Sequence, residues 1–156
     1  MWLAAWCISS STTIGLTWPR CSPCRCTARG RELLGDASVI VPIPLHYFRL
    51  WQRRFTQAAV LAQRLSMASD VPFDPLILRR IKPTPRQVGL TAAQREENVR
   101  GAFRVLADMR GRIAARPVLL VDDVYTSGAT AKAATRALLR GGAASVDVLT
   151  FARVIN

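Results

Sequence analysis

The chain has 156 residues, half of them hydrophobic, so we expect one domain with a substantial core rather than several domains. Lys and Arg number 22 against ten Asp and Glu, which gives a net charge of +12 and a sequence pI near 11.3. This balance favours polyanions as partners, either nucleic acid or phosphorylated small molecules. A basic surface without such a partner, as an Arg-rich composition can produce, is the alternative.

Residues 1–30 differ from the rest of the chain. They hold all four Cys and three of the four Trp, and they contain no Asp, Glu or Lys. A signal peptide would begin with basic residues, and a membrane-spanning helix would not be interrupted by the hydroxyl residues at 9–13. The cysteines lack the paired spacing of a zinc site, so we expect no zinc: Cys7, Cys21, Cys24 and Cys26. We favour a misread start or a frameshift, expect no membrane insertion, and place the domain at 31–156.

The first strand is expected at 37–44, where an apolar run ends in prolines. Residues 46–55 then mix aromatic side chains with arginines, and residues 56–69 have the apolar spacing of a helix. Loops of this kind gather at the carboxyl ends of parallel strands, where ligands bind. Arg53 and Arg54 in this loop are therefore candidates for binding a pyrophosphate.

The middle of the chain is basic and is broken by prolines. We expect short strands at 76–79 and 101–105, a non-rigid connection at 80–89, and a basic turn at 108–116. Thr91 and Gln94 have the spacing of a capping box, which predicts a short helix through about Val99.

The most informative stretch follows. Residues 118–121 are unbroken apolar residues, as in a strand buried on both faces, and Asp122 and Asp123 come directly after them. A loop of small residues leads into an Ala-rich helix expected at 129–140, which two glycines end. A further strand is expected at 145–154.

This unit predicts a binding site for a ribose phosphate. The free N–H groups and the dipole at a helix N-terminus attract phosphate, and small side chains let the phosphate approach the backbone. Two neighbouring carboxylates are explained if the ligand also carries a diol or a divalent metal ion. The predicted phosphate-binding residues are Thr126, Ser127, Gly128, Ala129 and Thr130.

The sequence LLVDDVYTSGAT resembles the phosphoribosyl pyrophosphate (PRPP) motif of type I phosphoribosyltransferases. The resemblance implies a three-layer α/β fold with a mainly parallel, twisted sheet. It also implies that Asp122 and Asp123 hold the ribose hydroxyls and organise Mg²⁺, largely through the substrate, as the catalytic acids. An ordinary surface strand–helix turn with a capping acidic pair is the alternative.

The stretch VPIPLHYFRLWQRRFTQA is similar to the ComF family, competence protein F-like proteins, with Arg54 replacing the frequent Gly and Thr56 the frequent Asn. A second match is carried by Arg79, Lys82, Thr84, Gln87, Leu90, Arg95, Asn98 and Phe103. In type I phosphoribosyltransferases this second region is a mobile loop that closes over substrate, so the resemblance makes Arg79 and Lys82 candidates for pyrophosphate. His46, the only histidine, is more simply explained as a loop residue than as a catalytic base.

The resemblance covers roughly residues 35–156, and the zinc-binding N-terminal region usual in the family has no equivalent. It implies a PRPP- and Mg²⁺-binding protein that transfers the phosphoribosyl group to an unidentified nitrogen nucleophile, linked to DNA uptake and its proteins. The alternative is a non-catalytic protein that binds single-stranded DNA through Tyr47, Phe48 and Trp51 among the loop arginines. A fragment without stable activity is a third. We expect a cytoplasmic location; the sequence selects neither acceptor nor oligomeric state.

Overall fold

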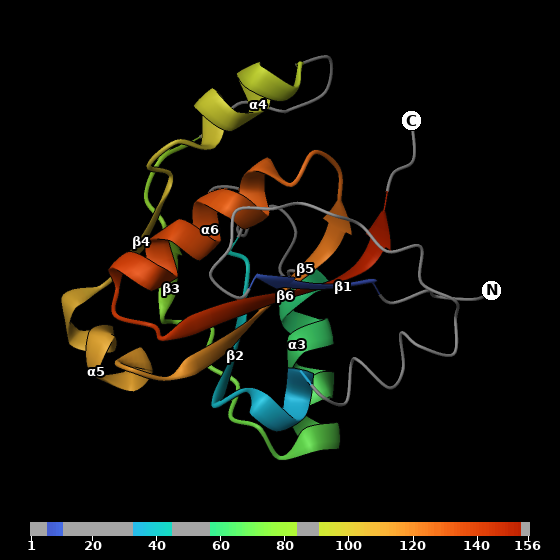
Figure 1. Ribbon diagram of the computed structural model, residues 1–156, viewed down its shortest axis with the longest axis vertical. Helices are drawn as coiled ribbons and strands as arrows, with labels where there is room; N and C mark the ends of the chain where they lie inside the picture. The colour runs from blue at the N-terminus through green and yellow to red at the C-terminus, as the bar shows by residue number, and fades with distance from the viewer. Residues whose placement is uncertain (1–5, 11–32, 45–56, 84–90, 154–156) are drawn as a thin grey trace.

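A computed structural model describes residues 6–10, 33–44, 57–83 and 91–153 (Figure 1). Residues 33–36 form a helical turn. The remaining elements, in chain order, are β1 (Trp6–Ser10), β2 (Val39–Pro42), α3 (Gln57–Ser69), β3 (Leu78–Arg80), α4 (Ala92–Val99), β4 (Phe103–Val105), a 3-10 turn (Ala107–Met109), α5 (Arg110–Ile113), β5 (Pro117–Tyr125), α6 (Ala129–Arg140) and β6 (Ser145–Arg153). Each strand and helix expected within these ranges is present, and most have bounds that differ by a few residues from those expected.

The main sheet has the strand order β1-β6-β5-β2. Strands β2, β5 and β6 run parallel, and β1 pairs antiparallel with β6 at one edge. The predicted α/β class with a mainly parallel sheet is therefore confirmed. The unbroken apolar run of β5 is explained by its position, because it lies between two strands and has a packed layer on each face.

Alternate residues of β5 serve two separate cores. Val118 and Leu120 pack with α6, β3 and β4, whereas Leu119 and Val121 pack with α3 on the opposite face. Figure 1 shows α6 and α3 lying on opposite sides of the sheet. This gives the three layers that the sequence predicts. The buried alanines of α6 allow that helix to lie close to the sheet: Ala131, Ala134 and Ala137.

Strands β3 and β4 form a second, antiparallel sheet of two strands, which the sequence did not predict as a pair. Helix α4 is joined to it and projects from the body beside α6 (Figure 1). The predicted capping box at its start is confirmed: Gln94 donates its backbone N–H to the Thr91 hydroxyl, and the Thr91 N–H donates to the Gln94 side chain at 2.9 Å.

Three segments differ from the expectations. The turn at 108–116 contains the end of the 3-10 turn and α5, because the chain there makes local helical hydrogen bonds such as that from the Ala114 N–H to the Arg110 carbonyl. Strand β5 continues through Tyr125 rather than ending at Val121, because β6 supplies pairing partners as far as Arg153. Residues 6–10 form β1, since the outer edge of β6 offers free backbone groups to a further strand.

Candidate functional site

The acidic pair lies at the carboxyl end of β5, between its two neighbouring parallel strands. Asp122 is in register with the buried Thr150 of β6, and β2 ends beside Val121 at Pro42. The chain after β2 stays at this edge, because the Ile43 N–H donates to the Val121 carbonyl at 2.8 Å. The pair therefore occupies the sheet edge at which ligands bind in open α/β folds.

Each carboxylate of the pair turns toward the backbone ahead of it. The Asp123 N–H donates to Asp122 Oδ1 at 3.0 Å, and the Val124 N–H donates to Asp123 Oδ1 at 2.9 Å. Burial, together with the charge and side chain of Asp123, raises the pKa of the Asp122 carboxyl to about 7. The Asp123 N–H and the positive charge of Arg80 act in the opposite direction. A cation or a hydroxyl donor bound here would be favourable, because either would offset the repulsion between the two buried carboxylates when both are ionised.

The loop after the pair requires a glycine. Gly128, directly before α6, has φ of 75°, the left-handed region that favours glycine. A Cβ at this position would also lie 2.7 Å from Cζ of Tyr125, so the tyrosine ring closes over the space that a side chain would need. Both the backbone conformation and the neighbouring ring therefore require glycine at this position.

The amides of this loop are available to a ligand. Within the described ranges, the N–H groups of residues 127–131 have no backbone acceptor, and the ladder of α6 begins only with the Lys132 N–H donating to the Gly128 carbonyl at 2.9 Å. The Ser127 hydroxyl is buried and likewise lacks a hydrogen-bond partner among the described residues. Backbone and hydroxyl donors therefore gather beside the acidic pair, in the arrangement that a phosphate needs.

Arg80 is a basic residue whose charge acts on the carboxylate of Asp122. The sequence did not single it out as a candidate. Its guanidinium lies 5.4 Å from the centre of the Phe103 ring, and its charge lowers the pKa of Asp122. The alternation of inward and outward side chains along β3 could have identified Arg80 as a candidate. Leu78 is buried, so Arg80, two residues further along β3, shares its inward face, while Arg79 is exposed on the other face.

The other candidate residues are distributed as follows. The seven residues of the motif, Asp122, Asp123 and 126–130, lie together at the end of β5. Lys82 lies on the α4 side of the small sheet, where its Nζ donates to the Arg100 carbonyl at 3.3 Å. Arg53, Arg54 and the aromatic loop around them lie outside the described residues, as does Thr84. In the ranges that the structure describes, no three His, Cys, Asp or Glu side chains gather as a metal cluster.

Comparison with known proteins adds a relationship to this geometry. No protein-family model matches the chain. Competence protein F of Haemophilus influenzae is 40% identical over 114 residues, DNA utilization protein YhgH of Escherichia coli is 36% identical over 116, and competence protein ComFC of Bacillus subtilis is 34% identical over 117. These matches cover 73–74% of this chain and 49%, 49% and 44% of the three relatives. The chain thus spans about half the length of the curated relatives that it matches.

Two solved structures resemble the fold at a distance. The allosteric regulatory enzyme of purine biosynthesis has a TM-score of 0.49 at 22% identity, over 78% of this chain and 25% of that one. Orotate phosphoribosyltransferase from Aeropyrum pernix has a TM-score of 0.38 at 15% identity, over 83% and 72%. The relationship of this chain rests on sequence identity and not on these distant structural matches. Over about half of their length, this chain is a homologue of the ComF competence proteins.

Proposed function

We propose that this chain binds PRPP together with Mg²⁺ at the carboxyl end of β5. One observation carries the proposal: two neighbouring carboxylates stand directly before a loop whose amides and Ser127 hydroxyl have no partner in the described part of the chain. A phosphate satisfies the loop, while a ribose diol or a metal ion satisfies the acids. In PRPP, the 5-phosphate and the diol belong to the same ribose, so one ligand can satisfy both the loop and the acids.

The donor set suits Mg²⁺. This ion prefers a few carboxylate oxygens combined with substrate oxygens and water, and Asp122 and Asp123 supply the carboxylates. When bound, Mg²⁺ would neutralise charge on the pyrophosphate as it leaves. The residues of the chain have separate tasks: the loop at 126–130 holds the 5-phosphate, and Asp122 and Asp123 orient the ribose through its hydroxyls.

Arg80 fits the role of balancing charge at this site, since its positive charge already acts on Asp122. Arg79 and Lys82 remain candidates for pyrophosphate by resemblance, as do Arg53 and Arg54. The proposed reaction is displacement of pyrophosphate from C1 of the ribose by a nitrogen nucleophile. Because its transition state resembles an oxocarbenium ion, positioning and charge stabilisation suffice without a covalent nucleophile on the protein.

The biological process in which this chain acts is proposed from the names of its relatives. Their names link them to competence and to DNA utilization, so we propose that this chain acts in the handling of incoming DNA in the cytoplasm, where PRPP is available. Among the residues that the structure describes, no helix has the length and apolar character needed to cross a membrane.

Calorimetry with PRPP, with and without Mg²⁺, tests the site. The wild-type chain should release or take up heat only with Mg²⁺, and an Asp122→Asn, Asp123→Asn double variant should lose this signal while keeping cooperative thermal unfolding. The charge-matched control is Asp36→Asn with Asp108→Asn, two exposed carboxylates away from the site. Absence of binding by a folded wild-type chain, or equal loss in both doubles, would remove the proposal. Release of pyrophosphate with nitrogenous acceptors then tests transfer.

A further inference from the structure

Tyr125 lies between the acidic pair and the loop that follows it. It is the last residue of β5, and its ring packs against the buried Gly128 of the loop. Among the ring atoms, the hydroxyl oxygen is the nearest to the position that a Cβ on Gly128 would occupy, and Cζ lies 2.7 Å from that position. The hydroxyl oxygen is therefore within about 4 Å of the Gly128 Cα. Tyr125 was not among the residues that the sequence assigned to the site.

The end of β5 holds this tyrosine outside the core. Strand β2 ends at Pro42, in register with Val121, so residues 122–125 have β6 as a partner on one side only. Tyr125 shares the parity of Leu119 and Val121 along the strand, but it lies beyond the core that they form. Its side chain is half-buried. An aromatic ring with a polar end is thus placed at the site and not in the core.

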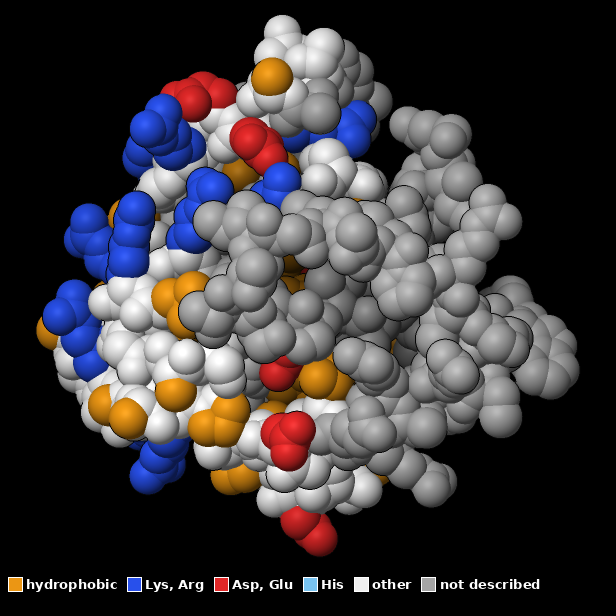
Figure 2. All heavy atoms as spheres, in the orientation of Figure 1, with side chains coloured by type: hydrophobic (Ala, Val, Ile, Leu, Met, Phe, Trp, Pro, Cys, Tyr) orange, Lys and Arg blue, Asp and Glu red, His pale blue; other side chains and the backbone are white. Residues whose placement is uncertain are grey.

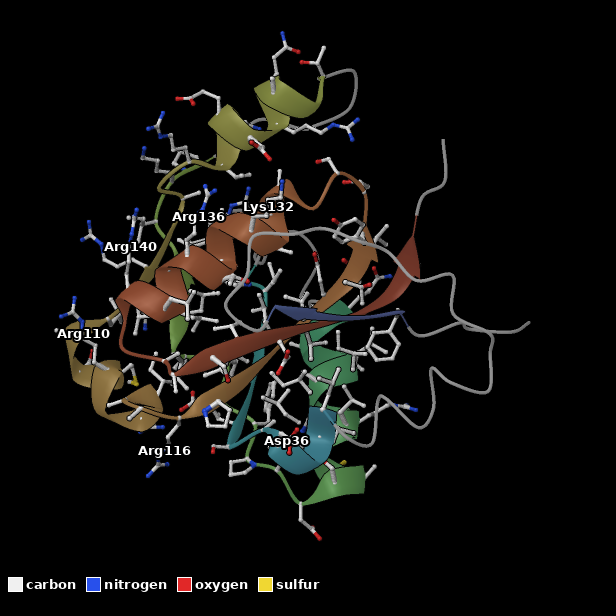
Figure 3. All side chains as sticks on the ribbon, viewed as in Figure 1. Asp36, Arg110, Arg116, Lys132, Arg136 and Arg140 are labelled. Atoms are coloured by element: carbon white, nitrogen blue, oxygen red, sulfur yellow. The ribbon has the colours of Figure 1, made fainter. Side chains whose placement is uncertain are left out.

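The loop itself carries no positive charge. Residues 125–131 contain no Lys or Arg, and the first cation of α6, Lys132, is paired with Glu96 at 2.8 Å. Figure 2 shows Lys and Arg side chains of the described residues gathered along the margin beside α6 and α5. In Figure 3, Arg136 and Arg140 follow Lys132 along α6 at increasing distance from the loop. A phosphate in the loop therefore depends mainly on neutral donors and on the helix dipole.

The phosphate has capacity for one more neutral donor. The described residues offer the N–H groups of 127–131 and the buried Ser127 hydroxyl. A phosphate monoester presents three strong acceptor oxygens, and a phenol hydroxyl is a donor of the right kind. A phosphate oxygen that accepts from the Gly128 N–H would lie roughly 4 Å from the Gly128 Cα, at a distance similar to that of the Tyr125 hydroxyl.

We propose that the Tyr125 hydroxyl donates a hydrogen bond to the phosphate monoester held by the loop at 126–130. Tyr125 is then a further binding residue, and it increases the selectivity of the site for 5-phosphorylated over unphosphorylated ribose. This inference rests on the proposed PRPP site and adds a residue outside its loop and its acidic pair. Replacement by phenylalanine removes the hydroxyl and keeps the ring over Gly128, so the hydrogen bond can be tested separately from the packing.

Calorimetry with ribose 5-phosphate tests the proposal, because this probe carries the phosphate and the diol without the pyrophosphate. The Tyr125→Phe variant should bind it ~10-fold more weakly than wild type, as expected for the loss of one hydrogen bond to a charged group. Affinity for Mg²⁺ and pyrophosphate without the sugar should stay within about two-fold, because that ligand does not need the loop. Cooperative thermal unfolding should be retained.

The matched control removes a hydroxyl from the opposite end of the sheet. Ser145 is the first residue of β6 and is in register with Pro117, whereas the site lies at the carboxyl ends of the strands. The Ser145→Ala variant should bind ribose 5-phosphate as wild type does.

Fluorine NMR of the chain labelled with 3-fluorotyrosine gives a second measurement. The chain has two tyrosines, Tyr47 and Tyr125, so the Tyr47→Phe variant leaves one resonance, that of Tyr125. Ribose 5-phosphate should shift this resonance. Ribose at the same concentration should leave it in place, because it offers no phosphate to the hydroxyl.

The outcomes separate this inference from the proposed function. If wild type binds PRPP and ribose 5-phosphate and the Tyr125→Phe variant binds them equally well, the PRPP site stands and the role of Tyr125 falls. Equal weakening in Ser145→Ala, equal weakening toward pyrophosphate, or a Tyr125 resonance that ribose 5-phosphate does not move would also overturn it. A folded wild-type chain that binds neither ribose 5-phosphate nor PRPP would remove both proposals.

Discussion

Lys132 of α6 donates a hydrogen bond to Glu96 of α4 at 2.8 Å, and this ion pair joins the two helices. Hydrogen bonding with Lys132, followed by the lysine charge itself, lowers the pKa of Glu96, and the charge of Arg136 acts in the same direction. Glu96 is therefore ionised at neutral pH and pairs with Lys132 as a full negative charge.

Replacement of this carboxylate should loosen the attachment of α4 to α6. The Glu96→Gln variant removes the charge that pairs with Lys132, so we expect amide hydrogen exchange in α4 to become faster. Thermal unfolding should change little, because both side chains of this ion pair are exposed to solvent. An Asp108→Asn variant, which removes an exposed charge outside α4 and α6, serves as control. Unchanged exchange in Glu96→Gln would show that the ion pair does not hold α4 beside α6.

The glycine before α6 should be essential to the loop. In Gly128→Ala, an alanine must adopt a φ of 75°, which costs roughly 1–2 kcal/mol, and its methyl group must displace the Tyr125 ring. Urea denaturation should show this loss of unfolding free energy, and PRPP binding should fall as the loop rearranges. Gly111→Ala is the control, because its position in α5 is open and has negative φ. It should gain up to about 1 kcal/mol. Equal stability of the two variants would contradict the strained loop.

The raised pKa of Asp122 predicts how stability depends on pH. Because the pKa is about 7 in the folded chain, against an ordinary value of 3.8, the folded state holds more protons than the unfolded state between these values. Stability should therefore fall as pH rises through this window. Melting temperatures measured between about pH 5 and about pH 8.5 should show this decline in wild type and a weaker decline in Asp122→Asn. Parallel profiles would show that Asp122 titrates normally.

The same titration should govern the proposed ligand. Mg²⁺ requires the ionised carboxylate, so affinity for Mg²⁺ and PRPP should increase as pH rises through about 7. Removal of the Arg80 charge in Arg80→Met should raise the pKa of Asp122 and move the midpoint of this increase to higher pH, while the methionine retains an apolar stem against Phe103. Calorimetry at several pH values measures the midpoint. Arg116→Met should leave it in place, and an unmoved midpoint in Arg80→Met would remove Arg80 from the site.

Local patterns in the sequence were sufficient to predict the helices and the loop that form the site. The capping box of α4 is made within four residues, and α6 begins at Ala129 and ends at Arg140 as predicted, since glycines bound it on both sides. Asp122 and the small-residue loop are neighbours along the chain, so contiguity alone brought them together. The i, i+4 spacing likewise placed Lys132, Arg136 and Arg140 on one face.

Tertiary structure decided the contacts between distant segments. Arg80 acts on Asp122 only because β3 packs on the face of β5 that carries Val118 and Leu120. Lys132 of α6 meets Glu96 only because α4 packs beside α6, although the two residues are 36 positions apart in the chain. Strand β1 extends the sheet through backbone pairing with β6, for which its side chains gave no periodic signal. Periodicity and capping act within a few residues, whereas these contacts depend on which surfaces the packed core brings together.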